Sequence, residues 1–472
     1  MKHKRHKTVA VLTAFPLLWA VVPALYAQAT YHHYVAIDLW TRGGPNSAGC
    51  VPDCRLLNNQ GTATFNSDTA KPDPFGSNPN DVFNDGNLVL GEYRQNGISI
   101  PLVSPPPGYN SYPEWISDTG LVAGLAENGK IDPTTTYPET VATLWLFGFP
   151  VALGTLGGTS SSAGAVNNIG QAIGGAANQV TDPFASAFYN YYAYGSPMWW
   201  PVSTETHAFL WQAGVIKDLG TLGGTDSLAL AINQGGQVAG VSLLNTATNP
   251  DTGLPAAHPF LWENGKMQDL GTLGGTMGQA AAINDSGQVT GISTLAGDQT
   301  THPFLWDGHQ MIDLKTLGGD NGSAIWMNNA GQVVGSADLP GSQVSHAFLW
   351  QNGKMTDLGT VDGDPCSSAF GLNSKGQVVG DSGPNGTCGG GAKGHAFLWQ
   401  APGPAVDVAR LFPALSSGLH PGGACCINDR GEILASGPLP NGDHHAMLLI
   451  PCDQNHPNIK GCDYSLVQVL PF

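Results

Sequence analysis

The apolar residues of this chain recur in short runs separated by turn residues, a pattern that predicts β-strands. The clearest stretch runs from His258 to Gly291. Its first strand reverses at Asn264-Gly265, a pair favoured in two-residue hairpins because both positions tolerate a positive φ. A type I turn at Asn284–Gly287 joins its third strand to a fourth. The four expected strands cover residues 258–262, 266–270, 280–283 and 288–293. Four short antiparallel strands are the content of one propeller blade.

Copies of this unit repeat along the chain, and close copies begin at His207, His302, His346 and His395. The turn motif that starts with Asn and has Gly three residues later gives the count, because each unit contains it once. It occurs eight times, at Asn58, Ser117 (where Ser replaces Asn), Asn167, Asn233, Asn284, Asn328, Asn373 and Asn428. The sequence therefore predicts an all-β fold, a β-propeller of eight four-stranded blades, with seven blades as the alternative and an open β-solenoid as the second choice.

The two ends of the repeat array predict how the ring closes. Residues 34–39 match a return strand, and residues 445–450 match a first strand. These two half-hairpins can complete one blade between them, which removes the free sheet edges. We therefore expect N- and C-terminal strands to share a blade.

The repeats also resemble a known family. The His-Ala-Phe-Leu-Trp strands at His207, His346 and His395, together with the Gly-Thr-Leu-Gly-Gly connectors and Ile-Asn-x-x-Gly-Gln-Val turns, are similar to the bacterial extracellular HAF-repeat family. The resemblance is clear over residues 206–400 and weaker elsewhere; Val141, for example, stands where His is expected. It implies an extracellular repeat protein and brings no activity with it.

The first 29 residues have the parts of a secretory signal peptide: a basic start, an apolar run at residues 9–22, and small residues at Ala27 and Ala29. We expect cleavage before Thr30, with cleavage after Ala27 as the alternative. No later apolar run is long enough to cross a bilayer. The protein is therefore expected to be secreted or periplasmic, with residues 30–472 forming a single repeat-built domain.

Charge narrows the choice of partners. Only 11% of residues are charged, against about 25% in typical domains, and the formal charge is −17. Loss of the four Lys and Arg residues of the signal peptide leaves −21. Such acidity serves solubility and disfavours nucleic acid or an anionic membrane as a partner. We expect a monomer without a cofactor.

The eight cysteines predict disulfides, because their number is even and the chain is expected to be exported. Their spacings match no zinc motif. The favoured pairs are Cys50–Cys54, Cys366–Cys388 and Cys452–Cys462, and the adjacent Cys425 and Cys426 are left open.

Several recurring residues could carry chemistry, and each has a structural interpretation. Six histidines occupy one repeat position, but equivalent atoms of successive blades lie too far apart to share an ion at ~2.1 Å. Each imidazole is therefore expected to bond a polar group in its own blade, with a metal site between His32-His33 and His444-His445 as the alternative. The six histidines are 207, 258, 302, 346, 395 and 445.

The recurring tryptophans are expected in the core between blades. They are residues 145, 211, 262, 306, 350 and 399.

An enzyme would need carboxylates that converge on one point. Glu92, Glu127, Asp338 and Asp381 follow fourth strands and would line the mouth of the tunnel if that strand were innermost. Their offsets differ, and no His or Arg recurs with them, so we interpret them as solvated loop acids. No nucleophile elbow, zinc-protease motif, phosphate loop or dinucleotide fingerprint occurs in a matching context.

The links between fourth and first strands vary most in length, so the face that carries them is the expected binding face. The insertion at 176–206 is rich in aromatic residues. They either pack over their own blade or stay exposed as a ligand-binding surface. The candidate ligand-binding residues are Tyr189, Tyr191, Tyr192, Tyr194, Trp199 and Trp200. The sequence thus predicts a non-catalytic binding or scaffold protein for an extracellular glycan or protein. The alternative is a propeller glycan hydrolase or lyase with carboxylates at the tunnel mouth.

Overall fold

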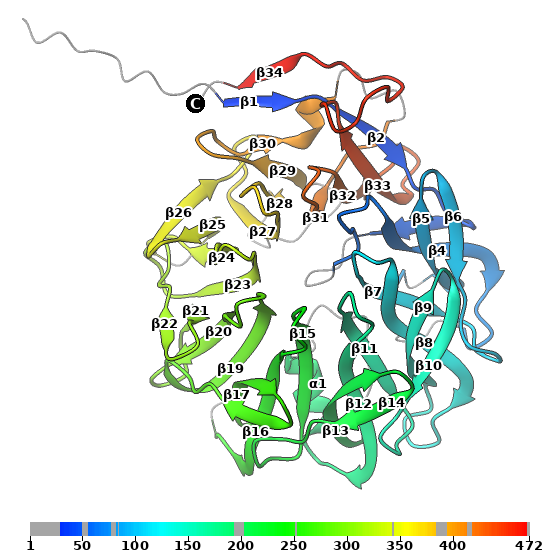
Figure 1. Cartoon of the computed structure of the whole chain (residues 1–472), viewed down its shortest axis with the longest axis vertical. Coiled ribbons are helices and arrows are strands. Elements are labelled where there is room, and N and C mark those ends of the chain that lie inside the picture. The colour runs from blue at the N-terminus through cyan, green and yellow to red at the C-terminus, as the bar shows by residue number, and fades with distance from the viewer. Residues whose placement is uncertain are drawn as a thin grey trace, which may run out of the picture.

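The computed structural model describes residues 29–469, except for 50–54, 77–81, 84, 193–202, 251–252, 342–343, 384–393 and 413–417. Within these residues, eight four-stranded antiparallel units are arranged in a ring around a central axis (Figure 1). Blades 4 and 5 are joined by one parallel bridge, between Ala257 and Met277. The fold is the expected eight-bladed β-propeller.

Seven blades follow the chain in order, and their first strands, such as β7, β15 and β23, lie nearest to the axis (Figure 1). Blade 1 contains β3 (Gly43–Ala48), β4 (Ala63–Pro72), β5 (Asn87–Gln95) and β6 (Ile98–Leu102). Blade 2 contains β7 (Ser111–Ile116), β8 (Leu121–Ile131), β9 (Pro138–Leu146) and β10 (Phe149–Gly154). Blade 3 contains β11 (Ser161–Val166), β12 (Ala172–Thr181), β13 (Thr204–Gln212) and β14 (Val215–Asp218). Blade 4 contains β15 (Ser227–Ile232), β16 (Val238–Thr248), β17 (Pro255–Glu263) and β18 (Lys266–Asp269).

The next three blades repeat this order. Blade 5 contains β19 (Gly274–Ile283), β20 (Val289–Leu295), β21 (Thr301–Trp306) and β22 (Met311–Asp313). Blade 6 contains β23 (Gly322–Met327), β24 (Val333–Asp338), β25 (Ser345–Gln351) and β26 (Lys354–Gly359). Blade 7 contains β27 (Cys366–Leu372), β28 (Val378–Gly383), β29 (His395–Trp399) and β30 (Val406–Asp407), followed by the 3-10 helix η1 (Val408–Leu411).

Blade 8 closes the ring with strands from both ends of the chain. It contains β31 (Gly423–Ile427), β32 (Ile433–Pro438) and β33 (His444–Pro451), and β2 (Tyr34–Asp38) is its outermost strand. The antiparallel register of β2 and β33 pairs Tyr34 with Pro451 and Asp38 with Met447. The expected closure by terminal strands is therefore confirmed.

The blades are out of phase with the units read from the sequence. In blade 5, for example, β19 and β20 come from the unit that begins at His258, whereas β21 and β22 come from the unit that begins at His302. The Gly-rich connector at 271–275 thus carries the chain from the outer strand of one blade to the inner strand of the next. The innermost strand is the third strand of the sequence unit and not the fourth, which corrects the premise about acids at the tunnel mouth.

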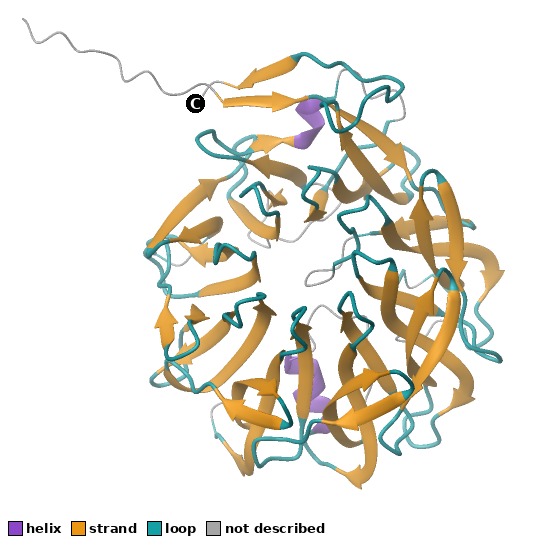
Figure 2. Cartoon of the chain, in the orientation of Figure 1, coloured by secondary structure: helices purple, strands orange, loops and turns teal. Residues whose placement is uncertain are grey.

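Two elements lie outside the ring or in its links. β1 (Ala29–His32) pairs with β34 (Leu466–Val469) in a two-stranded sheet beside blade 7 (Figure 1). The buried Tyr31 anchors this sheet, because its hydroxyl donates to the carbonyl of Pro404 at 2.7 Å. The helix α1 (Ala185–Tyr192) belongs to the aromatic insertion and is shown with η1 in Figure 2. Among the described residues, no helix has the length and apolar character that crossing a membrane requires.

The core lies between the blades. Each of blades 3 to 7 buries a Phe from its third strand, and one apolar cluster runs from Trp115 of blade 2 to Phe260 of blade 4. The recurring tryptophans contribute as expected: Trp145, Trp262, Trp306 and Trp399 are buried, and Trp211 and Trp350 are partly buried against the core clusters. Stability is therefore shared between neighbouring blades, as in other repeat proteins.

One of the expected disulfides is present. Cys452 and Cys462 are bonded to each other. Cys50, Cys54 and Cys388 lie outside the described residues, so the pairs Cys50–Cys54 and Cys366–Cys388 remain predictions.

Candidate functional site

The Asn turns meet around the axis of the ring. In each turn the Asn side chain accepts a hydrogen bond from the backbone N–H four residues later, as Asn233 does from Gln237 at 2.9 Å. The Gly three residues after the Asn adopts a positive φ, +80° at Gly236, which explains the conserved spacing of the repeats within this chain. This local geometry leaves the Asn amide nitrogen free to reach the next blade.

That amide donates to the backbone carbonyl of the equivalent residue in the next blade, which links the turns into a closed belt. The bonds are Asn58 to Ser117 (2.9 Å), Asn167 to Asn233 (3.1 Å), Asn233 to Asn284 (3.0 Å), Asn284 to Asn328 (3.4 Å), Asn328 to Asn373 (3.0 Å), Asn373 to Asn428 (3.0 Å) and Asn428 to Asn58 (2.9 Å). Ser117 has no amide, and there the backbone N–H of Asp118 donates to Asn168 Oδ1 at 2.9 Å. We call this ring of side chains the Asn belt.

A second ring of hydrogen bonds runs one residue further along each turn. Here, at seven of the eight steps around the ring, the backbone N–H donates to the side-chain oxygen of the equivalent residue in the next blade, as Asp429 does to Asn59 Oδ1 at 2.9 Å. The other donors are Asn59, Asp118, Asn168, Gln234, Asp285 and Ser374, and their acceptors are Asp118, Asn168, Gln234, Asp285, Asn329 and Asp429. The turns of one blade are therefore fixed by those of the next.

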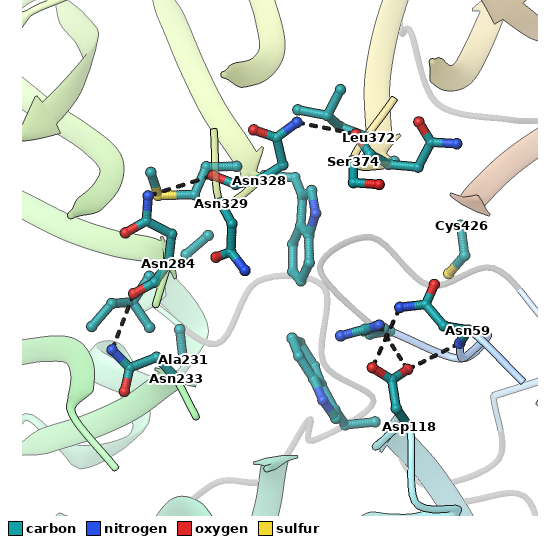
Figure 3. A pocket seen from close by; sticks show the side chains of 18 of the residues that line it. Asn59, Asp118, Ala231, Asn233, Asn284, Asn328, Asn329, Leu372, Ser374 and Cys426 are labelled. Atoms are coloured by element: carbon teal, nitrogen blue, oxygen red, sulfur yellow. Dashed lines mark hydrogen bonds and ion pairs between the residues drawn. The ribbon is translucent and has the colours of Figure 1, made fainter. Parts of the chain in front are cut away.

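The belt surrounds a cavity of about 320 Å³ on the axis (Figure 3). Inside it, Trp115 of β7 and Trp326 of β23 meet across the axis, with ring centroids 5.5 Å apart and an interplanar angle of 44°. Blades 2 and 6 stand opposite each other in the ring, so these two side chains span it. Arg55 also lines the cavity, and its guanidinium contacts Asp118 Oδ1 at 3.2 Å.

These tryptophans occupy one repeat position, two residues before the first residue of the turn. The other copies hold Leu56, Ala165, Ala231, Ala282, Gly371 and Cys426 there. In the inner strands β7, β11, β15, β19, β23, β27 and β31, a register shift directly precedes this position. Such bulges re-aim side chains. Sequence reasoning missed this pair because Trp115 and Trp326 lie outside the recurring Trp position, although an alignment of the units would have marked them.

The cavity offers mixed polar chemistry at its rim. In the described part of the chain, the side-chain NH₂ groups of Asn168 and Gln234 and the hydroxyl of Ser374 have no protein partner, and all three residues line the cavity. The carboxylates of Asp118, Asp285 and Asp429 accept hydrogen bonds of the second ring from backbone N–H groups. Three carboxylates against one guanidinium make the rim acidic. A ligand with hydroxyl groups and a flat apolar face fits these features.

The acids considered from the sequence do not reach this cavity. Glu92, Glu127 and Asp381 are buried within the blades, so the interpretation as solvated loop acids is wrong for them. Burial raises the pKa of Glu92, although its ion pair with Arg42 opposes this. Glu127 accepts from the Asn110 amide at 3.1 Å, and Asp338 accepts from the Ser345 hydroxyl at 2.7 Å. These contacts hold strands and links together.

The recurring histidines bond within their blades, as expected. Nδ1 of each His contacts the Asp of the neighbouring return strand in the pairs His207–Asp218 (2.9 Å), His258–Asp269 (2.8 Å), His302–Asp313 (2.9 Å), His346–Asp357 (3.0 Å) and His445–Asp38 (2.9 Å). The bond to Asp218 raises the pKa of His207. His395 departs from the pattern and contacts Asp364 at 2.8 Å. Near the seam, His33 contacts the Leu411 carbonyl at 3.1 Å, and among the described residues neither His32-His33 nor His444-His445 belongs to a group of three or more potential metal ligands.

The aromatic insertion is described only in part. Phe188 of α1 is fully buried against Leu228 and Val241 of blade 4, so this ring packs as core. The six candidate ligand-binding side chains lie outside the described residues, and their role stays a prediction: Tyr189, Tyr191, Tyr192, Tyr194, Trp199 and Trp200.

Comparison with known proteins finds similar solved structures at low identity. No protein-family model and no curated protein matches the chain. The β-propeller domain of the Trilobed protease from Pyrococcus furiosus is similar at 10% identity over 77% of this chain and 98% of that chain, with a TM-score of 0.44. A puromycin-hydrolyzing peptidase from Mycobacterium tuberculosis is similar at 12% identity over 87% of this chain and 62% of that chain, with a TM-score of 0.41.

Dipeptidyl peptidase 4 from Porphyromonas gingivalis is similar at 10% identity over 86% of this chain and 59% of that chain, with a TM-score of 0.43. The chain thus spans less than two thirds of the length of these last two peptidases. At such identities and TM-scores, the likeness carries no argument about activity.

Proposed function

We propose that this chain is an exported, non-catalytic binding protein of the HAF-repeat type, and that it holds a neutral sugar or the end of a neutral glycan in the central cavity. The observation that carries the proposal is the meeting of Trp115 and Trp326 inside a ring of amide and hydroxyl groups. Indole faces stack on the apolar faces of sugar rings, while amides bond the hydroxyl groups.

Cavity size and charge support this choice of ligand. Ligand pockets range from about 300 to 1,000 Å³, so a cavity of about 320 Å³ suits a small ligand or the end of a chain. The carboxylates of Asp285 and Asp429 at the rim disfavour anionic polymers, as does the net charge of −17. A neutral sugar carries no such penalty.

The rim also supports binding rather than catalysis. A glycan hydrolase needs one carboxylic acid that donates a proton and a second carboxylate that acts as base or nucleophile. Asp118, Asp285 and Asp429 each accept a hydrogen bond from a backbone N–H group of the neighbouring blade, so part of each carboxylate is already used to hold the ring together. The alternative, a propeller glycan hydrolase or lyase, would need one of these carboxylates to give up its hydrogen bond in the second ring.

Export and the variable-loop face remain part of the proposal. Residues 1–28 of the expected signal peptide, 1–29, lie outside the described residues, so secretion rests on the sequence. The aromatic insertion at 176–206 is a second candidate surface for a glycan or a protein partner. The two surfaces can be separated by mutation, because Trp326 belongs to the cavity and Tyr191 and Trp199 belong to the insertion.

The test is calorimetric titration of the purified mature protein with neutral gluco-, manno- and galacto-oligosaccharides, with product analysis of each mixture. We expect Trp326→Ala to weaken binding at least tenfold, about 1.4 kcal/mol, and Trp326→Phe to restore part of it. Trp350→Ala is the matched control, because Trp350 is also a partly buried Trp but packs away from the cavity. Its binding should equal that of the wild type.

Other outcomes decide between the alternatives. Binding that survives Trp326→Ala but fails in Tyr191→Ala with Trp199→Ala would move the site to the insertion. Cleaved sugar in the mixture would favour the enzyme. Absence of binding to every neutral oligosaccharide, in a wild type with normal melting, would reject a glycan ligand.

A further inference from the structure

Blade 7 breaks the rule that pairs each recurring His with the Asp of its return strand. In blades 3 to 6, this Asp lies opposite the Phe two residues after the His, as Asp357 lies opposite Phe348. Asp407 keeps that register, opposite Phe397, yet His395 bonds Asp364 instead, at 2.8 Å. Like its counterparts in the other blades, Asp407 accepts a hydrogen bond from the backbone N–H two residues later, here that of Ala409 at 2.8 Å, and this bond caps η1. The bond to the recurring His is missing.

The exchange creates a group of three side chains that the other blades lack. Asp362, His395 and Asp407 can each bring one ligand atom within 4.8 Å of the other two, and among the described residues no other group of three or more His, Cys, Asp or Glu does so. Asp362 comes from the turn between β26 and β27, His395 begins β29, and Asp407 ends β30. We propose that Asp362, His395 and Asp407 bind a divalent cation, Zn²⁺ in particular.

The orientation of the imidazole supports a metal ligand. Asp364 holds Nδ1 of His395 and is itself largely buried, with 7% of its side chain exposed. A ligating His nearly always donates its other ring N–H to such a carboxylate, which fixes the tautomer and directs the remaining nitrogen at the metal. Nε2 of His395 is therefore the nitrogen left for a cation. The ring of His420 lies 5.8 Å from that of His395 and can supply a fourth ligand by rotation.

Geometry and charge are compatible with a small ion. Around a tetrahedral ion with bonds of ~2.1 Å, ligand atoms lie about 3.4 Å apart, so the side chains need to close by on the order of 1 Å. Arg410 pairs with Asp362 through one carboxylate oxygen and is the cation that faces the group. The second oxygen of Asp362 is available to a metal.

The site would compensate for a weak point in the ring. β30 has only two residues, and its blade lacks the His–Asp bond that ties the two outer strands in its neighbours. An ion held by Asp362, His395 and Asp407 would link β29, β30 and the turn before β27. This is a structural role, independent of a ligand in the central cavity.

The test uses the full mature chain without a histidine tag, freed of metal by a chelator and titrated with Zn²⁺, Mn²⁺ and Ca²⁺. We expect one Zn²⁺ per chain by calorimetry and a melting temperature that rises with Zn²⁺. His395→Gln and Asp407→Asn should each abolish the response. Asp364→Asn should weaken the affinity about 10–100-fold while keeping one site, because Asp364 only orients the imidazole.

His346→Gln is the matched control, because His346 occupies the same repeat position in blade 6 but keeps the ordinary pair with Asp357. Its Zn²⁺ response should equal that of the wild type. Equal loss in His346→Gln, or no Zn²⁺ binding by the wild type, would overturn the proposal, and binding of Ca²⁺ alone would overturn the choice of Zn²⁺. If His395→Gln does not fold, Asp407→Asn and Asp364→Asn still decide the question.

Discussion

Replacing Asn373 with Ala tests whether the Asn belt holds the ring together. The Asn373 side chain is 3% exposed and donates to the carbonyl of Asn428 at 3.0 Å and to Gln377 Oε1 at 2.8 Å. Its oxygen accepts from the N–H groups of Gln377 at 3.0 Å and Lys375 at 3.1 Å. Alanine removes all of these bonds at once, both within the turn and between blades 7 and 8.

The expected cost follows from these contacts. A typical hydrogen bond contributes about 1 kcal/mol net, and a buried group left without its partner costs about 1–3 kcal/mol. The Asn428 carbonyl keeps its bond from Gly431 at 3.0 Å, and Gln377 is only half-buried, so part of this cost is relieved. We therefore expect Asn373→Ala to lower the free energy of unfolding by about 2–3 kcal/mol.

Equilibrium urea unfolding measures this change, and two further variants show where it arises. Ser374→Ala keeps the backbone N–H that bonds Asp429 at 2.8 Å, so it should change stability by less than about 0.5 kcal/mol. Asn373→Asp keeps the acceptor within the turn but loses the donor to the next blade. If Asn373→Ala were no worse than Ser374→Ala, the belt would be irrelevant to stability. If Asn373→Asp matched the wild type, its bond between blades would contribute nothing.

Three more outcomes follow from the fold. Deleting residues 34–39 removes the outer strand of blade 8, so calorimetric melting should fall steeply, and unchanged melting would contradict closure of the ring by this strand. Burial, followed by the hydrogen bond and charge of Asp85, raises the pKa of Asp68 from its ordinary 3.8 to about 8. The contribution of Asp68 to stability therefore falls as pH rises from about 4 to 8. Asp68→Asn should stabilise in urea unfolding at pH 8 more than at pH 4, and an equal gain at both would refute this. Ser117 is the one turn residue of the belt without an amide, and Ser117→Asn would add a donor toward the Asn167 carbonyl. We expect this change to raise the free energy of unfolding, measured in urea, by about 1 kcal/mol. No gain would mean that this step of the belt does not need the amide.

The sequence predicted the fold because its determinants are local. Asn-x-x-Gly turns, Asn-Gly hairpins and alternating apolar residues each specify a short strand or turn without reference to the rest of the chain. Repetition then supplied the number of blades, and the return strand at 34–39 supplied the closure. For five of the six recurring histidines the in-blade partner could also be expected, because hairpin register places an Asp near each of them, as it places Asp269 near His258; His395 is the exception.

The blade boundary was harder to place from sequence. The strand at His258 and its return strand form the tightest hairpin in the unit, so they look like its beginning. In the ring they are the outer half of a blade, because the connector at 271–275 is long enough to lead back to the axis. The separation along the sequence does not tell which two consecutive hairpins pair to form one blade.

The Trp115–Trp326 contact depends on ring geometry, which no single repeat contains. Both residues occupy the position two before the turn, where Ala231, Ala282 and Gly371 are small. Small residues at that position leave room on the axis, and one Trp alone would extend into this space without a partner of its own size. Trp115 and Trp326 belong to blades 2 and 6, four blades apart, and in an eight-membered ring these positions face each other. In a seven-bladed ring no blade stands directly opposite another, so the same two residues could not meet head-on. The contact between the two tryptophans therefore depends on an even number of blades, and it determines the shape of the cavity. For this reason the cavity could be recognised only once the number of blades and the closure of the ring were known.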